Sequence, residues 1–100
     1  VIQAQGASIS DCGNPTGLNS VVCIGGYVSL NSATIDNPDT DGVACSSGGE
    51  INAVSCIVTN IPVGHVGFFI GESSIIKAYG ATGTLSQAAN TITTNGLIIQ

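Results

Sequence analysis

The stretch Leu18-Asn19-Ser20-Val21-Val22-Cys23-Ile24 is matched, 33 residues further along the chain, by Ile51-Asn52-Ala53-Val54-Ser55-Cys56-Ile57. Each stretch ends in a cysteine and an isoleucine, and each of these cysteines has another cysteine eleven residues before it. Similarity at a fixed spacing indicates an internal repeat. We therefore predict pseudo-repeats of about 33 residues. A weaker third copy is expected at Leu85–Ile92, where Asn90 takes the place of the cysteine.

The four cysteines form two pairs with the same separation, Cys12 with Cys23 and Cys45 with Cys56. A structural zinc site usually combines two close pairs, and a redox site uses C-x-x-C, so neither fits this spacing. In a short chain with few charges, four cysteines are more typical of two disulfides. The repeat favours the pairing Cys12–Cys23 with Cys45–Cys56, and a crossed pairing between the repeats stays open.

Disulfides form in oxidising compartments, so the cysteine pattern predicts a secreted protein. The chain begins at Val1 and contains no methionine, and no charged segment followed by an apolar one is present. We therefore expect a mature protein whose signal peptide has been removed. No apolar run approaches the ~18–20 residues that span a bilayer. The prediction is an extracellular or cell-wall-associated protein without a transmembrane segment.

Lys77 is the only lysine or arginine, and the formal net charge is −5. Nucleic-acid binding needs a basic surface that neutralises phosphates, so this class of function is excluded, and anionic membranes are disfavoured for the same reason. The mean hydropathy is +0.45 although few residues are charged. We expect a surface of uncharged polar groups, which gives little repulsion between molecules and favours adhesion or self-association.

Valine, isoleucine and threonine are frequent, and no window shows the i, i+3, i+4, i+7 periodicity of an amphipathic helix. The sequence therefore predicts a single all-β domain over residues 1–100, a small disulfide-stapled β-sandwich or barrel with about seven short strands. The expected strands are Val1–Ser10, Val21–Asn31, Glu50–Thr59, His65–Gly71, Ser74–Tyr79, Thr91–Thr94 and Gly96–Gln100. Asn95-Gly96 is typical of a type I′ hairpin turn, and Gly71-Glu72-Ser73 is expected to turn a second hairpin.

The densest group of oxygen-bearing side chains is Asp36-Asn37-Pro38-Asp39-Thr40-Asp41-Gly42. Alternate oxygen ligands followed by a glycine match the first half of a calcium-binding loop. The acid that closes such a loop is missing, because Gly48 stands at its position and Glu50 comes two residues later. Two interpretations stay open, a solvated turn or a calcium site. The calcium ligands would be Asp36, Asn37, Asp39 and Asp41, and no other cofactor is predicted.

His65 is the only histidine, so a histidine-dependent nucleophilic site would have to include it. It stands in Pro62-Val63-Gly64-His65-Val66-Gly67, which indicates a turn or the edge of a strand. The acids offer no pair suited to glycoside hydrolysis. Gly25-Gly26 and Gly48-Gly49 lack the following lysine of a phosphate-binding loop. The sequence therefore predicts a protein without enzymatic activity.

Three of the four aromatic residues, Phe68, Phe69 and Tyr79, lie close together in the sequence. Because side chains alternate along a strand, Phe68 and Phe69 should face opposite sides. One of the two then belongs to the core, and the other is either covered by another element or exposed as a contact residue. These three aromatic residues are the candidate binding residues.

An acidic, β-rich chain with four cysteines resembles the small secreted cysteine-containing proteins of fungi, including effectors and elicitors of plant pathogens. Locally, Gly67-Phe68-Phe69-Ile70-Gly71-Glu72-Ser73-Ser74-Ile75-Ile76-Lys77-Ala78 is similar to a strand pair in the compact β-sandwich toxins and effectors of fungi. The resemblance implies a β-sandwich and a role in virulence. The cysteine spacing and the internal repeat depart from that group, so its six-strand topology and its functional residues are not carried over.

Three functions remain as hypotheses. The first is a non-enzymatic, effector- or elicitor-like interaction protein that binds a host protein or another host surface component through sheet edges and an uncharged face. The second is a surface-active or cell-wall coat protein that assembles at interfaces. The third is a lectin-like or calcium-dependent carbohydrate-binding module, whose partner would be a cell-wall or surface polysaccharide.

Overall fold

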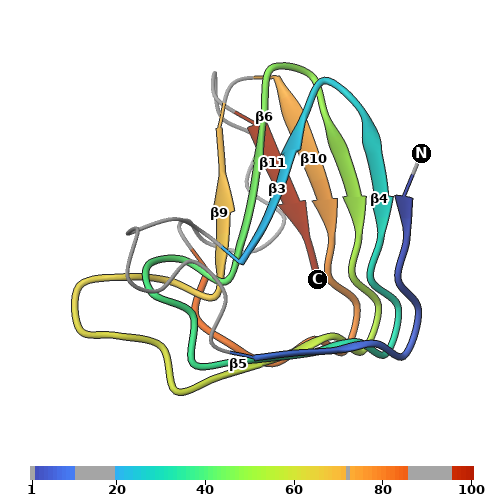
Figure 1. The fold of residues 1–100 in the computed structure, drawn as a ribbon. Coiled ribbons are helices and arrows are strands. Elements are labelled where there is room, and N and C mark those ends of the chain that lie inside the picture. The colour runs from blue at the N-terminus through green and yellow to red at the C-terminus, as the bar shows by residue number, and fades with distance from the viewer. Residues whose placement is uncertain (1, 11–19, 72, 86–95) are drawn as a thin grey trace.

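The computed structural model describes residues 2–10, 20–71, 73–85 and 96–100, and these form a parallel β-solenoid of about three turns (Figure 1). The strands are rich in valine and isoleucine, which favour extended backbone. They are β1 (Ile2–Gln3), β2 (Ser8–Ser10), β3 (Val21–Ile24), β4 (Tyr27–Ser29), β5 (Thr34–Asp36), β6 (Val43–Ser46), β7 (Glu50–Asn52), β8 (Ile57–Thr59), β9 (Phe68–Ile70), β10 (Ser74–Lys77) and β11 (Gly96–Ile99).

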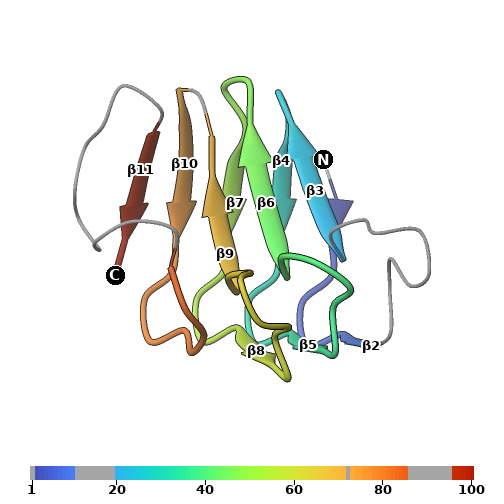
Figure 2. The ribbon, with the colours of Figure 1, turned by 90° about the vertical axis from the view of Figure 1, so that its left-hand side faces the viewer.

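The strands belong to three sheets, and all the pairings between them are parallel. Sheet A has the order β1-β4-β7-β10-β11, sheet B the order β2-β5-β8, and sheet C the order β3-β6-β9. Each of the first three coils therefore gives one strand to each sheet. Seen along the coil, the three sheets form three sides of the molecule (Figure 1), and a view from the side shows successive coils next to one another (Figure 2).

The register stacks similar apolar residues on one another in the interior. The inward ladders are Ile2, Val28, Ile51, Ile76 and Ile98 in sheet A, Ile9, Ile35 and Val58 in sheet B, and Val21, Val43 and Phe68 in sheet C. From the second coil onward, every one of these side chains is at most 4% exposed. Full burial of one such side chain contributes roughly 1.5–3 kcal/mol, so the ladders are the main source of stability.

The corner between sheets A and B repeats one turn in four successive coils. Its third residue has a positive φ, which is 67° at Gly6, 58° at Ser32, 55° at Ser55 and 64° at Gly80. In each turn the following N–H donates to the carbonyl three residues earlier, as from Ala33 to Leu30 at 3.0 Å. Between equivalent positions the chain advances by 22 to 26 residues, as the ladder from Ile2 to Ile98 shows.

The predicted sandwich or barrel is wrong, although the all-β class is confirmed. A sandwich is built largely from antiparallel strands, whereas here each connection turns a corner into another sheet. The hairpin expected at Gly71-Glu72-Ser73 is absent, because β9 belongs to sheet C and β10 to sheet A. Residues 91–95 lie outside the described residues, and β11, which contains Gly96, pairs parallel with β10. The two strands β5 and β6 were not predicted.

The 33-residue repeat is also wrong. Cys23 pairs with Cys45 on neighbouring strands of sheet C, whereas Cys56 lies in the corner between sheets A and B. The sequence match therefore aligned a strand with a corner. Apart from Leu85, the third copy lies outside the described residues.

Disulfides do not staple the described fold. Cys23, Cys45 and Cys56 are buried free thiols, and Cys12 lies outside the described residues. The bond predicted between Cys45 and Cys56 is absent because the two residues occupy different parts of a coil. In the part of the chain that the structure describes, no helix is long and apolar enough to cross a membrane.

Candidate functional site

Each sheet has an outer side as well as an inner one, because side chains alternate along a strand. The polar face is the outer side of sheet A, with Gln3, Tyr27, Ser29, Glu50, Asn52, Ile75, Lys77, Leu97 and Ile99 on its strands. The hydroxyl face is the outer side of sheet B, with Ser8, Thr34, Asp36, Ile57, Thr59 and the bridging Thr82. The apolar face is the outer side of sheet C, with Val22, Ile24, Ala44, Ser46 and Phe69.

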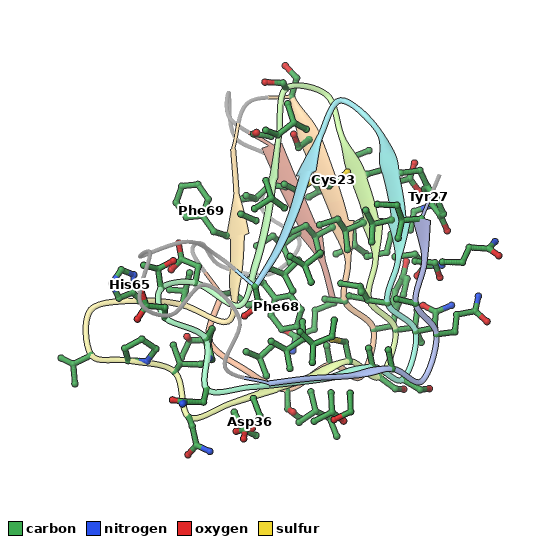
Figure 3. The ribbon with its side chains drawn as sticks, viewed as in Figure 1. Cys23, Tyr27, Asp36, His65, Phe68 and Phe69 are labelled. Atoms are coloured by element: carbon green, nitrogen blue, oxygen red, sulfur yellow. The ribbon has the colours of Figure 1, made fainter. Side chains whose placement is uncertain are left out.

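The polar and apolar faces lie on opposite sides of the molecule. Tyr27 and Phe69 point away from each other, whereas Phe68 points into the interior (Figure 3). Phe68 is fully buried and Phe69 is 44% exposed, so the predicted alternation of the two phenylalanines is confirmed and Phe69 is the exposed member.

An ion pair occupies the centre of the polar face. Lys77 Nζ on β10 lies 2.8 Å from Glu50 Oε1 on the neighbouring strand β7, and both side chains are partly exposed. The hydrogen bond to Glu50, together with its charge, raises the pKa of Lys77, and Tyr27 and Tyr79 raise it further. The cation and its carboxylate are therefore held together and both stay charged at neutral pH.

Next to this ion pair, Asn52 has an unused hydrogen-bond acceptor. Asn52 stands between Ser29 and Lys77 in the register of sheet A. Among the described residues, its side-chain oxygen is buried and has no hydrogen-bond partner. A buried polar atom of this kind is costly when it is left unpaired, so it is a natural acceptor for a ligand hydroxyl.

Further uncharged polar groups extend the polar face toward the first coil. Gln5 Nε2 donates to Ser29 Oγ at 3.4 Å, and the side-chain oxygen of Asn31 accepts a hydrogen bond from Val54 N at 3.2 Å. Tyr79, 49% exposed, follows β10 at the corner next to this face. The face therefore combines amides, a hydroxyl, a neutralised ion pair and tyrosine rings.

The hydroxyl face holds a carboxylate whose partners come from the next coil. Asp36 Oδ1 accepts hydrogen bonds from Thr59 Oγ1 at 2.8 Å and from Asn60 Nδ2 at 2.6 Å. The bonds from Thr59 and Asn60 lower the pKa of Asp36. This face carries no aromatic residue on the strands β2, β5 and β8.

The predicted calcium ligands have separate partners. Asp36 bonds to Thr59 and Asn60, whereas Asp41 Oδ1 accepts from Val66 N at 2.9 Å and lies 3.5 Å from His65 Nδ1. Asn37 is at a corner with a φ of 54°. Within the described residues, no group of three or more His, Cys, Asp or Glu side chains is placed to hold a metal ion. Calcium binding stays a prediction.

His65 has a structural contact that the sequence did not reveal. It lies in the long connection between β8 and β9, where its N–H donates to Pro62 O at 3.1 Å. Together with the bond from Val66, its approach to Asp41 holds this connection against the one that precedes β6. The described part of the surface contains no pocket.

Of the predicted binding residues, Phe69 lies on the apolar face, Tyr79 lies beside the polar face, and Phe68 belongs to the core. The structure does not bring them together into one site. Sequence reasoning missed Tyr27, Glu50 and Asn52, which are far from Lys77 in the chain and become its neighbours only through the register of sheet A. The signal was alternation of outward and inward residues at the true coil length.

Comparisons with known proteins give no further assignment: no family model, no curated protein and no solved structure matches this chain.

Proposed function

We propose that this chain is a non-enzymatic interaction protein whose polar face binds an extended, neutral polysaccharide. The observation that carries the proposal is the group around Asn52, where an unpartnered buried acceptor lies beside a closed ion pair and between tyrosines on one flat sheet. Amides and hydroxyls supply hydrogen bonds to sugar hydroxyls, and tyrosine rings cover the apolar side of a sugar ring.

The shape of the polar face favours an extended ligand over a small compact one. Small molecules are usually bound in concave pockets, and none is found in the described part of the surface. Five strands spaced 4.7–4.9 Å apart give a strip about 19 Å long. A strip of this length suits several consecutive sugar units of a polymer.

The charge of the protein favours a neutral polymer. The net charge is −5, and Lys77, the only lysine or arginine, is already paired with Glu50. A polyanionic chain would therefore meet repulsion without gaining a free cation. In an effector- or elicitor-like role, the polymer would be a component of a host surface.

The test is retention on insoluble neutral polysaccharides such as cellulose, chitin and β-1,3-glucan, measured by depletion of the protein from solution. We expect retention on at least one of them, and Asn52→Ala should weaken it about fivefold because one hydrogen bond is worth ~1 kcal/mol. Thr59→Ala, on the hydroxyl face, is the matched control and should bind as the wild type does. Binding to none of the polymers would contradict the proposal.

A chelator separates this proposal from calcium-dependent recognition. The polar-face group contains no cluster of acids, so retention should be the same with and without chelator. If the chelator abolishes retention, the calcium-dependent alternative around Asp36 and Asp41 replaces the polar face as the site.

The apolar face supports a second candidate, assembly as a surface coat. Val22, Ile24 and Phe69 are 48%, 69% and 44% exposed, and the strands β3, β6 and β9 carry no charged residue. A sheet that is apolar on both sides is typical of sheets covered on both sides. Concentration-dependent particle size, measured by light scattering, tests this candidate, and a monomer at all concentrations would exclude it.

A further inference from the structure

Two buried cysteines face each other across the first two coils. Cys23 on β3 and Cys45 on β6 are direct register partners. Both point inward, and they are 3% and 1% exposed. Neighbouring strands lie about 4.7–4.9 Å apart, which falls within the ~4.4–6.8 Å that separates the Cα atoms of a disulfide.

A glycine leaves the space in which the two sulfurs meet. A Cβ atom at Gly49 would lie 3.0 Å from Cys23 Sγ and 3.1 Å from Cys45 Sγ, so both sulfurs border the same point. Gly26 precedes Tyr27, the register partner of Glu50, and is therefore the equivalent residue one coil earlier. A Cβ at Gly26 would meet nothing within 4 Å. The absence of a side chain at Gly49 therefore matters specifically to the thiol pair.

We propose that Cys23 and Cys45 form a site of reversible oxidative modification, which closes to a disulfide between the first and second coils. This pair differs from both pairs expected from the sequence repeat, and it does not depend on the proposed polysaccharide binding. The third described cysteine, Cys56, is equally buried but lies in the corner between sheets A and B.

The oxidant is a small-molecule disulfide such as oxidised glutathione. The thiolate of one cysteine attacks the glutathione disulfide, forms a mixed disulfide and releases one glutathione thiolate. The second cysteine thiolate then attacks the protein sulfur of the mixed disulfide and releases the second glutathione. Two protein thiols become one disulfide, two protons are released, and the glutathione disulfide is reduced to two glutathione molecules.

The reaction requires that the first coil open and that a thiol lose its proton. Burial, followed by the neighbouring Cys23, raises the pKa of Cys45 to about 12. The first coil is the better candidate for opening, because its core residue Ile2 is 60% exposed. Since the thiolate is the nucleophile, we expect the oxidation rate to rise about tenfold per pH unit between pH 7 and 8.

The experiment treats the native chain with oxidised glutathione, blocks the remaining thiols and maps the disulfides by mass spectrometry without reduction. Chymotrypsin and a Glu-specific protease cut at Leu18, Tyr27 and Glu50, so each cysteine lies on a separate peptide. We expect a linked pair of peptides containing Cys23 and Cys45, which disappears on reduction. A link of either residue to Cys12 or Cys56, or no protein disulfide at all, would overturn the proposal.

Two glycine variants test the geometry itself. Gly49→Ala should form the Cys23–Cys45 bond at least about tenfold more slowly than the wild type, because a misplacement of ~1 Å between reacting groups can slow their reaction by ~100-fold. Gly26→Ala should oxidise at the wild-type rate. Circular dichroism checks that both variants are folded, and equal rates for a folded Gly49→Ala would contradict the assigned geometry. If Gly49→Ala does not fold, the peptide map of the native chain still decides the pairing.

Discussion

The outer faces of sheet A and sheet C differ strongly, although their backbones and inner sides are alike. Both sheets are parallel and both bury an apolar ladder, yet the polar face presents Asn52 and the Glu50–Lys77 ion pair, whereas the apolar face presents Val22 and Phe69. The inner side of a coil therefore determines the fold, and the outer side is free to differ between sheets. The difference assigns ligand recognition to sheet A and contact with other apolar surfaces to sheet C.

The largest expected effect compares the two sides of sheet C within one strand. Phe68→Ala should cost about 3–5 kcal/mol in the free energy of unfolding, because it empties a fully buried site. Phe69→Ala, the adjacent control, should cost less than ~1 kcal/mol, because its side chain is 44% exposed. Urea denaturation measures both values. Equal losses would mean that the apolar face is covered in solution.

The next effect separates what lies beneath the two faces. Burial raises the pKa of Cys45 to about 12 and that of Cys56 to about 11, from an ordinary value of 9.0. The unfolded chain loses these protons near pH 9 and the folded chain does not, so stability is fully present below pH 9 and falls between pH 9 and about 11–12.

The expected loss by pH 11 is about 1–2 kcal/mol for each thiol. It is measured by chemical denaturation between pH 8 and pH 11 under reducing conditions. Cys45→Ala should remove one share of this loss, although it also costs some stability at neutral pH. A flat profile up to pH 11 would show that the thiols titrate normally in the folded protein.

A smaller effect exchanges the proposed roles of the two faces. Tyr27→Ala should weaken retention on the bound polysaccharide about tenfold, because an aromatic contact is worth ~1 kcal/mol or more. It should leave concentration-dependent association unchanged. Phe69→Ala should do the reverse, weakening association without changing retention. Variants that alter both readouts together would remove the distinction between the faces.

The smallest expected effect concerns the ion pair on the polar face. Glu50→Gln leaves Lys77 unpaired, yet an exposed ion pair contributes little to stability, so the melting temperature should hardly change. The variant should bind acidic polysaccharides better than the wild type at low salt, because it frees a cation. Thr34→Ala on the hydroxyl face is the control. Unchanged discrimination between neutral and acidic polymers would contradict the role given to Glu50.

Much of the local structure could be predicted from the sequence, because alternation has a short range. The all-β class follows from the valine and isoleucine content, and the opposite orientation of Phe68 and Phe69 follows from the alternation of side chains. The coil itself was missed because its length varies from 22 to 26 residues, so equivalent positions do not recur at a fixed spacing.

The true repeat signal lies in the corners rather than in the cysteines. Gly6, Ser32, Ser55 and Gly80 mark the same turn, but serine with a positive φ gives no distinctive sequence signature. Cys23 and Cys56 stand out in the sequence and do not occupy equivalent positions. The candidate site depends on register in the same way, since Tyr27, Glu50 and Lys77 are brought together only when coils are stacked in their observed alignment.

The connection between β8 and β9 shows how such a molecule can change. It runs through residues 60–67, longer than the turns at the other corner, and its Val63 side chain is fully exposed. The strands on both sides of it nevertheless keep their pairing with β5 and β6. Added residues at this position would leave the stacked ladders undisturbed, so variation or engineered insertions can introduce new surface chemistry here without redesign of the interior.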